Sequence, residues 1–187
     1  MRVVLWGIVA VMLSVMPMVA DCFVGQPGKV TYNDGRVITI IQRHGDDLTY
    51  TEPYEGYQDA VNKTHMMLFP KTSRRGARAT EIRWSSPLPK LKQMVPGYHF
   101  DLKGTMKSGD GSPLPYRNEG DVLGKEVVKV GNCTYDVLVI KTVAYLDNQA
   151  ITVTTDYLSI DLLVVMRSDI NVISSGRQVK RTVVAIQ

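Results

Sequence analysis

The sequence lacks the short motifs by which common catalytic and metal sites are recognised. It has no G-x-S-x-G nucleophile elbow and no glycine-rich phosphate loop, and Gly109-Asp110-Gly111 lacks the acidic spacing of a calcium loop. The three histidines, His44, His65 and His99, stand at no metal-ligand spacing from one another or from a cysteine. We therefore expect no metal and no cofactor, and an enzyme is the least favoured class of function.

A large excess of one charge is also missing. The chain has 22 lysines and arginines against 18 acidic residues, a formal net charge of +4. An excess of this size does not by itself indicate nucleic-acid binding, so we expect no nucleic acid as a partner. The chain shows no convincing repeat, low-complexity segment or linker, which favours one domain.

The first twenty residues differ from the rest. Arg2 is followed by an uncharged, mainly apolar run over residues 3–19, and Ala20 supplies a small residue for cleavage. This order is typical of a secretory signal peptide. We predict a signal peptide over residues 1–20 and a single β domain over residues 21–187, exported to the periplasm. Secretion and an uncleaved N-terminal membrane anchor are the alternatives, the second because the run is about long enough to cross a bilayer.

Only two cysteines are present, Cys22 and Cys133, and both follow the predicted cleavage site. Exported proteins enter an oxidising compartment, where an even number of cysteines favours a disulfide. We predict a Cys22–Cys133 disulfide that closes a loop of roughly 110 residues and ties the N-terminus to the domain. The alternative is two unpaired thiols. Lipidation of Cys22 is disfavoured, because Asp21 is not the small neutral residue expected there.

Strand signals dominate the rest of the chain. Patterns rich in β-branched residues or with a period of two lie at residues 37–43, 48–54, 80–84, 98–106, 126–130, 135–145, 150–158 and 179–186. Turn residues stand at Asn33-Asp34-Gly35, Gly131-Asn132 and Asp147-Asn148. About nine or ten short strands predict a mainly β fold: a single curved antiparallel sheet or open half-barrel, with a β-sandwich as the alternative.

Four segments have patterns of other kinds. Residues 70–79 read as a polar loop, and residues 57–67 as a strand or a short helix. Residues 85–96 contain three prolines and predict an irregular crossing. Residues 162–166 are continuously apolar and are expected to be buried.

Two groups of residues are candidates for surface binding. The basic group consists of Lys71, Arg74, Arg75 and Arg78. It could contact lipid phosphates or another anionic surface, although a solvated loop is the simpler interpretation. The aromatic group consists of Tyr50, Tyr54 and Tyr57. It could stack on sugars or fill a protein interface, although packing at a sheet rim is the simpler interpretation.

One part of the chain resembles a known group of proteins. Residues 124–130 and 131–140 form a predicted strand pair around a Cys-x-Tyr sequence, followed by Thr155-Asp156-Tyr157-Leu158-Ser159 and Leu163-Val164-Val165-Met166-Arg167. This order is similar to that of uncharacterised exported bacterial proteins that look related to the half-barrel LolA/LolB lipoprotein carriers. The resemblance implies a curved sheet with a concave apolar face, and lipid or lipoprotein handling as one activity.

Three hypotheses of function follow. The first is an exported binding protein for an apolar or lipid-like ligand in the cell envelope, for which a lined cavity is expected. The second is a structural or protein-interaction component of the envelope, with another envelope protein as partner. The third is an enzyme, which would require titratable groups that converge in a cleft.

Overall fold

The computed structural model describes residues 22–54 and 57–187, so the predicted signal peptide lies outside the described residues. The described chain is built from antiparallel strands and one short 3₁₀ helix. The strands are β1 (Lys29–Tyr32), β2 (Val37–His44), β3 (Asp47–Tyr54), β4 (Tyr57–His65), β5 (Phe69–Arg75), β6 (Arg78–Trp84), β7 (His99–Ser108), β8 (Leu114–Val130), β9 (Cys133–Leu146), β10 (Gln149–Ser159), β11 (Val165–Val172) and β12 (Arg177–Ile186). The 3₁₀ helix, η1 (Leu91–Gln93), lies between β6 and β7.

The sheet closes into a barrel of these twelve strands. Each strand pairs with its neighbours in the sequence, and β12 returns to pair with β1, where Ile186 lies opposite Val30. The mainly β prediction is confirmed, but the open half-barrel is wrong, and so is the sandwich alternative. The pairing that closes the barrel depends on β1, which has only four residues and carries too short a pattern to be recognised as a strand.

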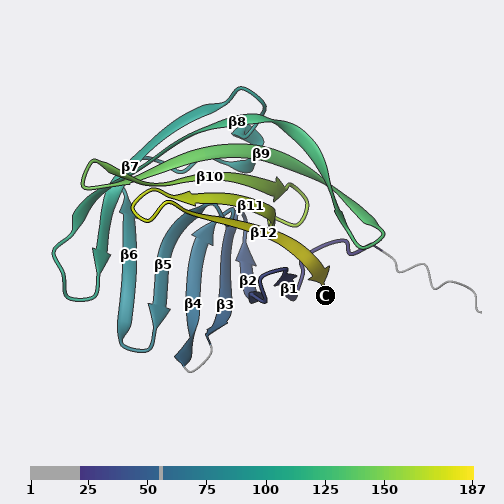
Figure 1. Ribbon diagram of the computed structural model, residues 1–187, viewed down its shortest axis with the longest axis horizontal. Helices are drawn as coiled ribbons and strands as arrows, with labels where there is room; N and C mark the ends of the chain where they lie inside the picture. Colours follow the sequence, from purple (N-terminus) through teal and green to yellow (C-terminus); the bar gives the residue numbers. More distant parts are fainter. Residues whose placement is uncertain (1–21, 55–56) are drawn as a thin grey trace, which may run out of the picture.

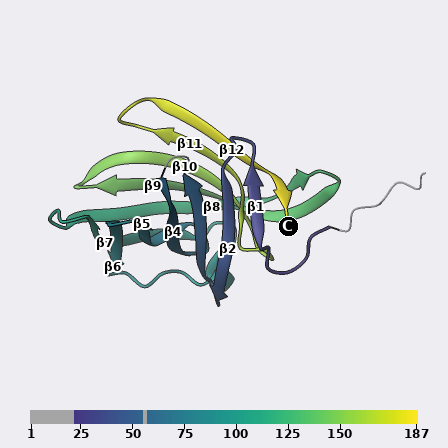
Figure 2. The same ribbon diagram turned by 90° about the horizontal axis from the view of Figure 1, so that it is seen from below.

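The barrel is flattened into two layers that cross steeply. Figure 1 shows β8–β12 running across the view and β2–β6 running at a large angle to them. Figure 2 shows the same two groups stacked face to face. Inward side chains of the two layers therefore form the interior of the protein.

One end of the interior is filled by an apolar plug. Fully buried side chains from both layers meet there, including Ile38, Leu48, Phe69, Val122, Leu138, Ile140 and Leu158. The connection from β10 to β11 adds Leu162, Leu163 and Val164, as the apolar run predicted. Leu163 has a left-handed backbone (φ 54°), a strain that its complete burial offsets. The proline-rich crossing adds Met94, and its irregular structure is confirmed.

The structure also tests the predictions for two other segments. Residues 70–79 are not a loop, since they form most of β5, a two-residue turn and the start of β6. Residues 57–67 form the strand β4 rather than a helix. Both regions lack a hydrophobic period of two because polar side chains lie on both faces of these strands, as Ser73 and Arg74 do on β5.

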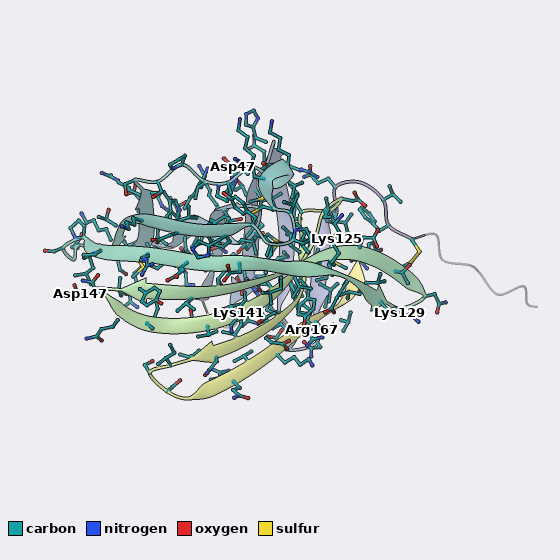
Figure 3. All side chains as sticks on the ribbon, turned by 90° about the horizontal axis from the view of Figure 1, so that it is seen from above. Asp47, Lys125, Lys129, Lys141, Asp147 and Arg167 are labelled. Carbon is teal, nitrogen blue, oxygen red and sulfur yellow. A yellow bond between two sulfur atoms is a disulfide. The ribbon has the colours of Figure 1, made fainter. Side chains whose placement is uncertain are left out.

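The predicted disulfide is confirmed: Cys22 is bonded to Cys133, with the two Cα atoms 5.3 Å apart. Cys133 begins β9, so the bond fastens the N-terminal segment to the tip of the β8–β9 hairpin. Figure 3 shows Lys129 close to this tip and Asp147, in the β9–β10 turn, at the other extreme of the molecule. The chain therefore enters the fold at the end opposite to the β9–β10 turn.

Removing the disulfide should lower stability without changing the fold. The bond spans 111 residues, and closing so long a loop restricts the unfolded chain strongly. We expect reduction, or the Cys22→Ser/Cys133→Ser double substitution, to lower the free energy of unfolding by about 2–4 kcal/mol in urea titrations. The double variant should not respond to reductant. Equal unfolding midpoints for the oxidised and reduced protein would contradict this account.

Candidate functional site

The end of the barrel opposite the plug carries a polar hollow, which we call the mouth pocket. The turns from β5 to β6, β7 to β8, β9 to β10 and β11 to β12 surround this end. The mouth pocket has a volume of about 860 Å³. It is lined by Gln58, Ser73, Arg75, Gly76, Ala77, Arg78, Thr80 and Ser108.

Strand alternation places these side chains on the inner wall. Ala60 on β4 and Ile82 on β6 are buried, and residues two positions away on a strand share a face. Gln58, Thr80 and Arg78 therefore point inward with them. The strand pairing aligns polar inward residues across four neighbouring strands, so that each lies opposite the next: Asn62, Ser73, Thr80 and Ser108. The hydroxyls of Thr80 and Ser108 lie 3.4 Å apart.

The mouth pocket has a positive lining. Arg75 and Arg78 stand directly opposite each other at the β5–β6 turn, and none of the described lining residues is Asp or Glu. Like charges in opposed positions of a sheet repel. Guanidinium groups donate hydrogen bonds to carboxylate and phosphate groups, so two arginines in this lining suit an anion.

Another part of the inner wall, on β9 and β10, is rich in hydroxyl groups, although none of its residues lines the mouth pocket. On β10, Thr154 lies opposite Thr142 of β9, which is buried inside the barrel. Thr152 and Thr154 face inward but remain half-buried, so solvent reaches this part of the interior. The period of two predicted for this strand is present, and its polar face, with Thr152, Thr154 and Asp156, points into the barrel.

Asp156 continues this face toward the plug. Ser168 Oγ on β11 donates a hydrogen bond of 2.5 Å to Asp156 Oδ1. Asp156 is half-buried by exposed area, and protein atoms surround its carboxyl group. Burial raises the pKa of the Asp156 carboxyl to about 6, with a further increase from the nearby Asp169, against the opposing effect of the Ser168 hydrogen bond.

Near β1–β3, another group of polar side chains forms its hydrogen bonds within the protein. Arg36 donates two hydrogen bonds to the Glu52 carboxylate, at 2.6 and 2.8 Å, and its guanidinium lies over the Tyr32 ring at 5.5 Å. The Tyr32 hydroxyl donates to the carbonyl of Val165 at 3.0 Å. Burial raises the pKa of Tyr32 above its ordinary value. These contacts fix the wall beside the pocket and leave little capacity for a ligand.

The basic group predicted from the sequence is divided by the barrel wall. Arg75 and Arg78 line the mouth pocket, whereas Arg74 is exposed and lies opposite Val61 on the outer face. Lys71 donates to Asp47 Oδ2 at 2.6 Å, at the far end of β5. Only two of the four residues are therefore brought together.

Tyr50, one of the three tyrosines of the predicted aromatic group, is buried and does not form part of an exposed cluster. The Tyr50 side chain is 7% exposed and faces the barrel interior opposite Ile40. The side chains of Tyr54 and Tyr57 lie outside the described part of the structure, which gives only their backbone pairing. An aromatic contact through these residues stays a prediction.

A polar cluster that the sequence did not reveal holds the proline-rich crossing against the barrel. His65 Nδ1 lies 2.7 Å from Asp47 Oδ1, and His65 Nε2 lies 2.7 Å from the carbonyl oxygen of Pro89. Although burial opposes it, hydrogen bonds from Lys71 and His65 lower the pKa of Asp47. Both histidine nitrogens are thus engaged with acceptors of the protein itself, which points to a structural role.

Neither a metal centre nor a membrane helix is found in the described ranges. Residues 22–54 and 57–187 contain no cluster of three or more histidine, cysteine or acidic side chains suited to a metal ion. Within the same residues, no helix is long and apolar enough to cross a membrane.

The geometry defines a class: a closed antiparallel β-barrel with an apolar plug at one end and a polar mouth at the other. The chain matches no protein-family model, and no curated protein matches it significantly in sequence. Its fold is similar to that of the hypothetical lipoprotein YmcC from Escherichia coli (K12), with a TM-score of 0.53 and 10% identity over 87% of this chain and 89% of that one. This likeness concerns the fold alone, and it does not support the narrower resemblance to the LolA/LolB carriers.

The raised pKa of Asp156 predicts how stability depends on pH. Because the folded-state pKa, about 6, exceeds the ordinary value of 3.8, the folded protein holds a proton that the unfolded chain releases. This contribution is complete below about pH 4 and is lost as the pH rises through about 6, at a cost of at most about 3 kcal/mol. Asp156→Asn should therefore be more stable than the natural protein at pH 7.5 and similar to it at pH 4.

Chemical unfolding at several pH values measures this effect. The exposed Asp161→Asn substitution serves as the control and should follow the natural pH profile. The assignment fails if Asp156→Asn and the natural protein lose stability in parallel between pH 4 and pH 7.5.

Proposed function

We propose that the protein is an exported binding protein of the cell envelope that takes a polar, anionic ligand into the mouth pocket. The observation that carries this proposal is the pair Arg75 and Arg78, opposed at the rim of a polar hollow of about 860 Å³. Arginine forks suit carboxylate and phosphate groups, and the neighbouring Ser73, Thr80 and Ser108 supply hydroxyls for the remainder of a ligand.

The disulfide supports export. Structural disulfides persist in oxidising compartments such as the periplasm and are rare in reducing ones. YmcC, the protein of similar fold, is a hypothetical lipoprotein, which is consistent with the envelope as the site of action. In this chain the Cys22 sulfur is bonded to Cys133, and a sulfur in a disulfide is not free to carry a lipid. We therefore favour a periplasmic protein that is not anchored to a membrane through a lipid on Cys22.

The apolar or lipid-like ligand expected from the sequence fits this geometry less well. The apolar half of the interior is filled by packed side chains such as Leu138, Leu158 and Leu162, each at most 1% exposed. A lipid chain would have to displace this plug, whereas a polar ligand can enter the mouth pocket with the plug intact.

Charge removal inside the pocket tests the proposal. Arg75→Gln/Arg78→Gln should weaken binding of pyrophosphate at least tenfold in isothermal titration calorimetry, because both charged donors are lost. Arg74→Gln is the matched control, since Arg74 is the adjacent arginine on the outer face. It should bind within twofold of the natural protein. An equal loss in both variants, or tighter binding of palmitate than of pyrophosphate, would count against an anion site in the mouth.

A second candidate function, protein interaction, is favoured by the edge of the β8–β9 hairpin. Beyond Val122, β8 pairs with β9 alone among the described strands, so residues 123–130 present an open edge. Leu123 and Val127 on this edge are 57% and 58% exposed. Figure 3 shows Lys125 and Lys129 along the same strand. Open edges with apolar side chains accept strands of other proteins.

Crosslinking in the native envelope tests this second candidate. If the hairpin edge pairs with a partner strand, Val127→Lys should abolish a specific adduct that the natural protein forms. Ile41→Lys changes an equally exposed residue, at 58%, on β2 and should leave the adduct in place. A natural protein that forms no adduct would remove the support for this candidate.

A further inference from the structure

His65 lies between two groups that can only accept hydrogen bonds. Its Nδ1 atom is 2.7 Å from Asp47 Oδ1, and its Nε2 atom is 2.7 Å from the carbonyl oxygen of Pro89. The Asp47 carboxylate is ionised, because hydrogen bonds from Lys71 and His65 lower its pKa although burial opposes them. Neither oxygen carries a proton to offer, so each contact requires an N–H on the imidazole ring.

This geometry fits the doubly protonated form of the ring. A neutral imidazole carries a single N–H, so in either tautomer one ring nitrogen would present its lone pair to an oxygen atom 2.7 Å away. The imidazolium form donates to both oxygens at once. The His65 side chain is only 12% exposed, so little water reaches the ring to replace a lost partner.

The barrel holds the His65 ring in place. His65 is the last residue of β4, and Met66, which follows it, is fully buried with a left-handed backbone (φ 52°). Met66 N donates to the Asp46 carbonyl at 2.7 Å. On its other side the His65 ring packs against the buried Phe69 ring, with the ring centroids 6.2 Å apart. A change in the hydrogen bonds of His65 therefore acts on the partner with the freer backbone, the proline-rich crossing.

The crossing covers part of the apolar plug. Its Met94 side chain is 2% exposed, and Leu88 and Leu91 pack against the same core. Pro89, whose carbonyl meets His65, lies between these residues in the sequence. A further contact runs from Leu91 N to Asp46 Oδ2 at 3.0 Å. Polar contacts with the strand ends of the barrel thus keep the apolar side chains of the crossing in position.

The charged groups around His65 come from several elements. Asp47 on β3 accepts a second hydrogen bond, of 2.6 Å, from Lys71 on β5. The hollow beside His65 is also lined by His44 and Asp46 near the β2–β3 turn, Glu81 on β6 and Lys90 on the crossing. Among these kinds of side chain, histidine is the one that changes its charge between about pH 5 and pH 8.

We propose that the proton on His65 fastens the proline-rich crossing over the apolar plug, so that the crossing is held at acidic pH and released at alkaline pH. Loss of the proton removes one of the two N–H groups and sets a lone pair against an acceptor oxygen. The contact with Pro89 then breaks, and Met94 can leave the plug. The proposal is independent of the anion site, which lies at the opposite end of the barrel.

Amide hydrogen exchange of the natural protein tests the release. Residues 137–140 of β9, in the plug, report opening of the whole barrel, whereas residues 88–95 report local opening of the crossing. Between pH 5.5 and pH 8, after correction for intrinsic exchange rates, protection of the crossing should fall at least tenfold more than protection of β9. An equal change in the two segments would overturn the proposal.

His65→Gln tests the assignment to this residue. The variant carries no imidazole proton, so protection of its crossing relative to β9 should be low and equal at both pH values. His99→Gln is the matched control, since His99 Nδ1 also lies close to a carboxylate, 2.9 Å from Asp121 Oδ1, but on the exposed surface. It should keep the natural pH dependence. A pH dependence that survives in His65→Gln would contradict the role of His65.

Nitrogen-15 NMR of the histidine rings gives a second readout that needs no substitution at His65. Both ring nitrogens of His65 should carry protons at pH 5.5, and the midpoint of their titration should coincide with the midpoint at which the crossing loses protection. A His65 ring that is already neutral at pH 5.5, or one that titrates while the crossing stays protected, would overturn the proposal.

Discussion

The hydrogen bonds that close β1 onto β12 are the constraint on which the remaining structure depends. Gly28 N and Lys29 N both donate to the Gln187 carbonyl, at 2.7 and 2.8 Å, and Gln187 N donates to the Lys29 carbonyl at 2.9 Å. β1 then pairs with β2 on its other side, where Val30 lies opposite Ile38. Closure satisfies the two edges that a curved sheet would leave open and encloses an interior with two distinct ends. The disulfide at Cys22 lies seven residues before Lys29 and restrains the segment that leads into this short closing strand.

The two ends of the interior differ because the inward side chains change character along the strands. On β9 the inward residues run from Leu138 and Ile140 in the plug to Thr142 and Ala144 toward the mouth. On β10 the corresponding change runs from Leu158 to Asp156 and Thr154. Apolar side chains therefore fill one end of the interior, while the inward residues toward the mouth are more polar, apart from the small apolar cluster of Ile82, Tyr116 and Ala144. This division explains how a protein without a catalytic motif can carry an accessible, charged pocket inside a stable fold.

The sequence was sufficient to predict turns with characteristic residues and the pairing of its only two cysteines. Asp147 and Asn148 have left-handed backbones in the β9–β10 turn, as turn residues of this kind predict. The disulfide followed from compartment and cysteine number. Closure could not be predicted, because a four-residue strand has almost no pattern and its partner is at the other end of the chain.

The candidate site was only partly visible for a related reason. Arg75 and Arg78 were recognised as basic residues, but assigned to a loop together with Lys71 and Arg74. A hydrophobic period marks a strand only when one face is apolar, and β5 has polar side chains on both faces at the mouth.

The central claim is that Arg75 and Arg78, which point into the mouth pocket, bind anions, whereas Arg74, on the outer face of the barrel, does not. Solution NMR of the arginine Nε–H groups during a pyrophosphate titration measures this most directly. The account predicts saturable shifts of the Arg75 and Arg78 resonances and no comparable shift for Arg74, the neighbour that the strand turns outward. Equal shifts for all three arginines, or no shift for Arg75 and Arg78, would contradict it.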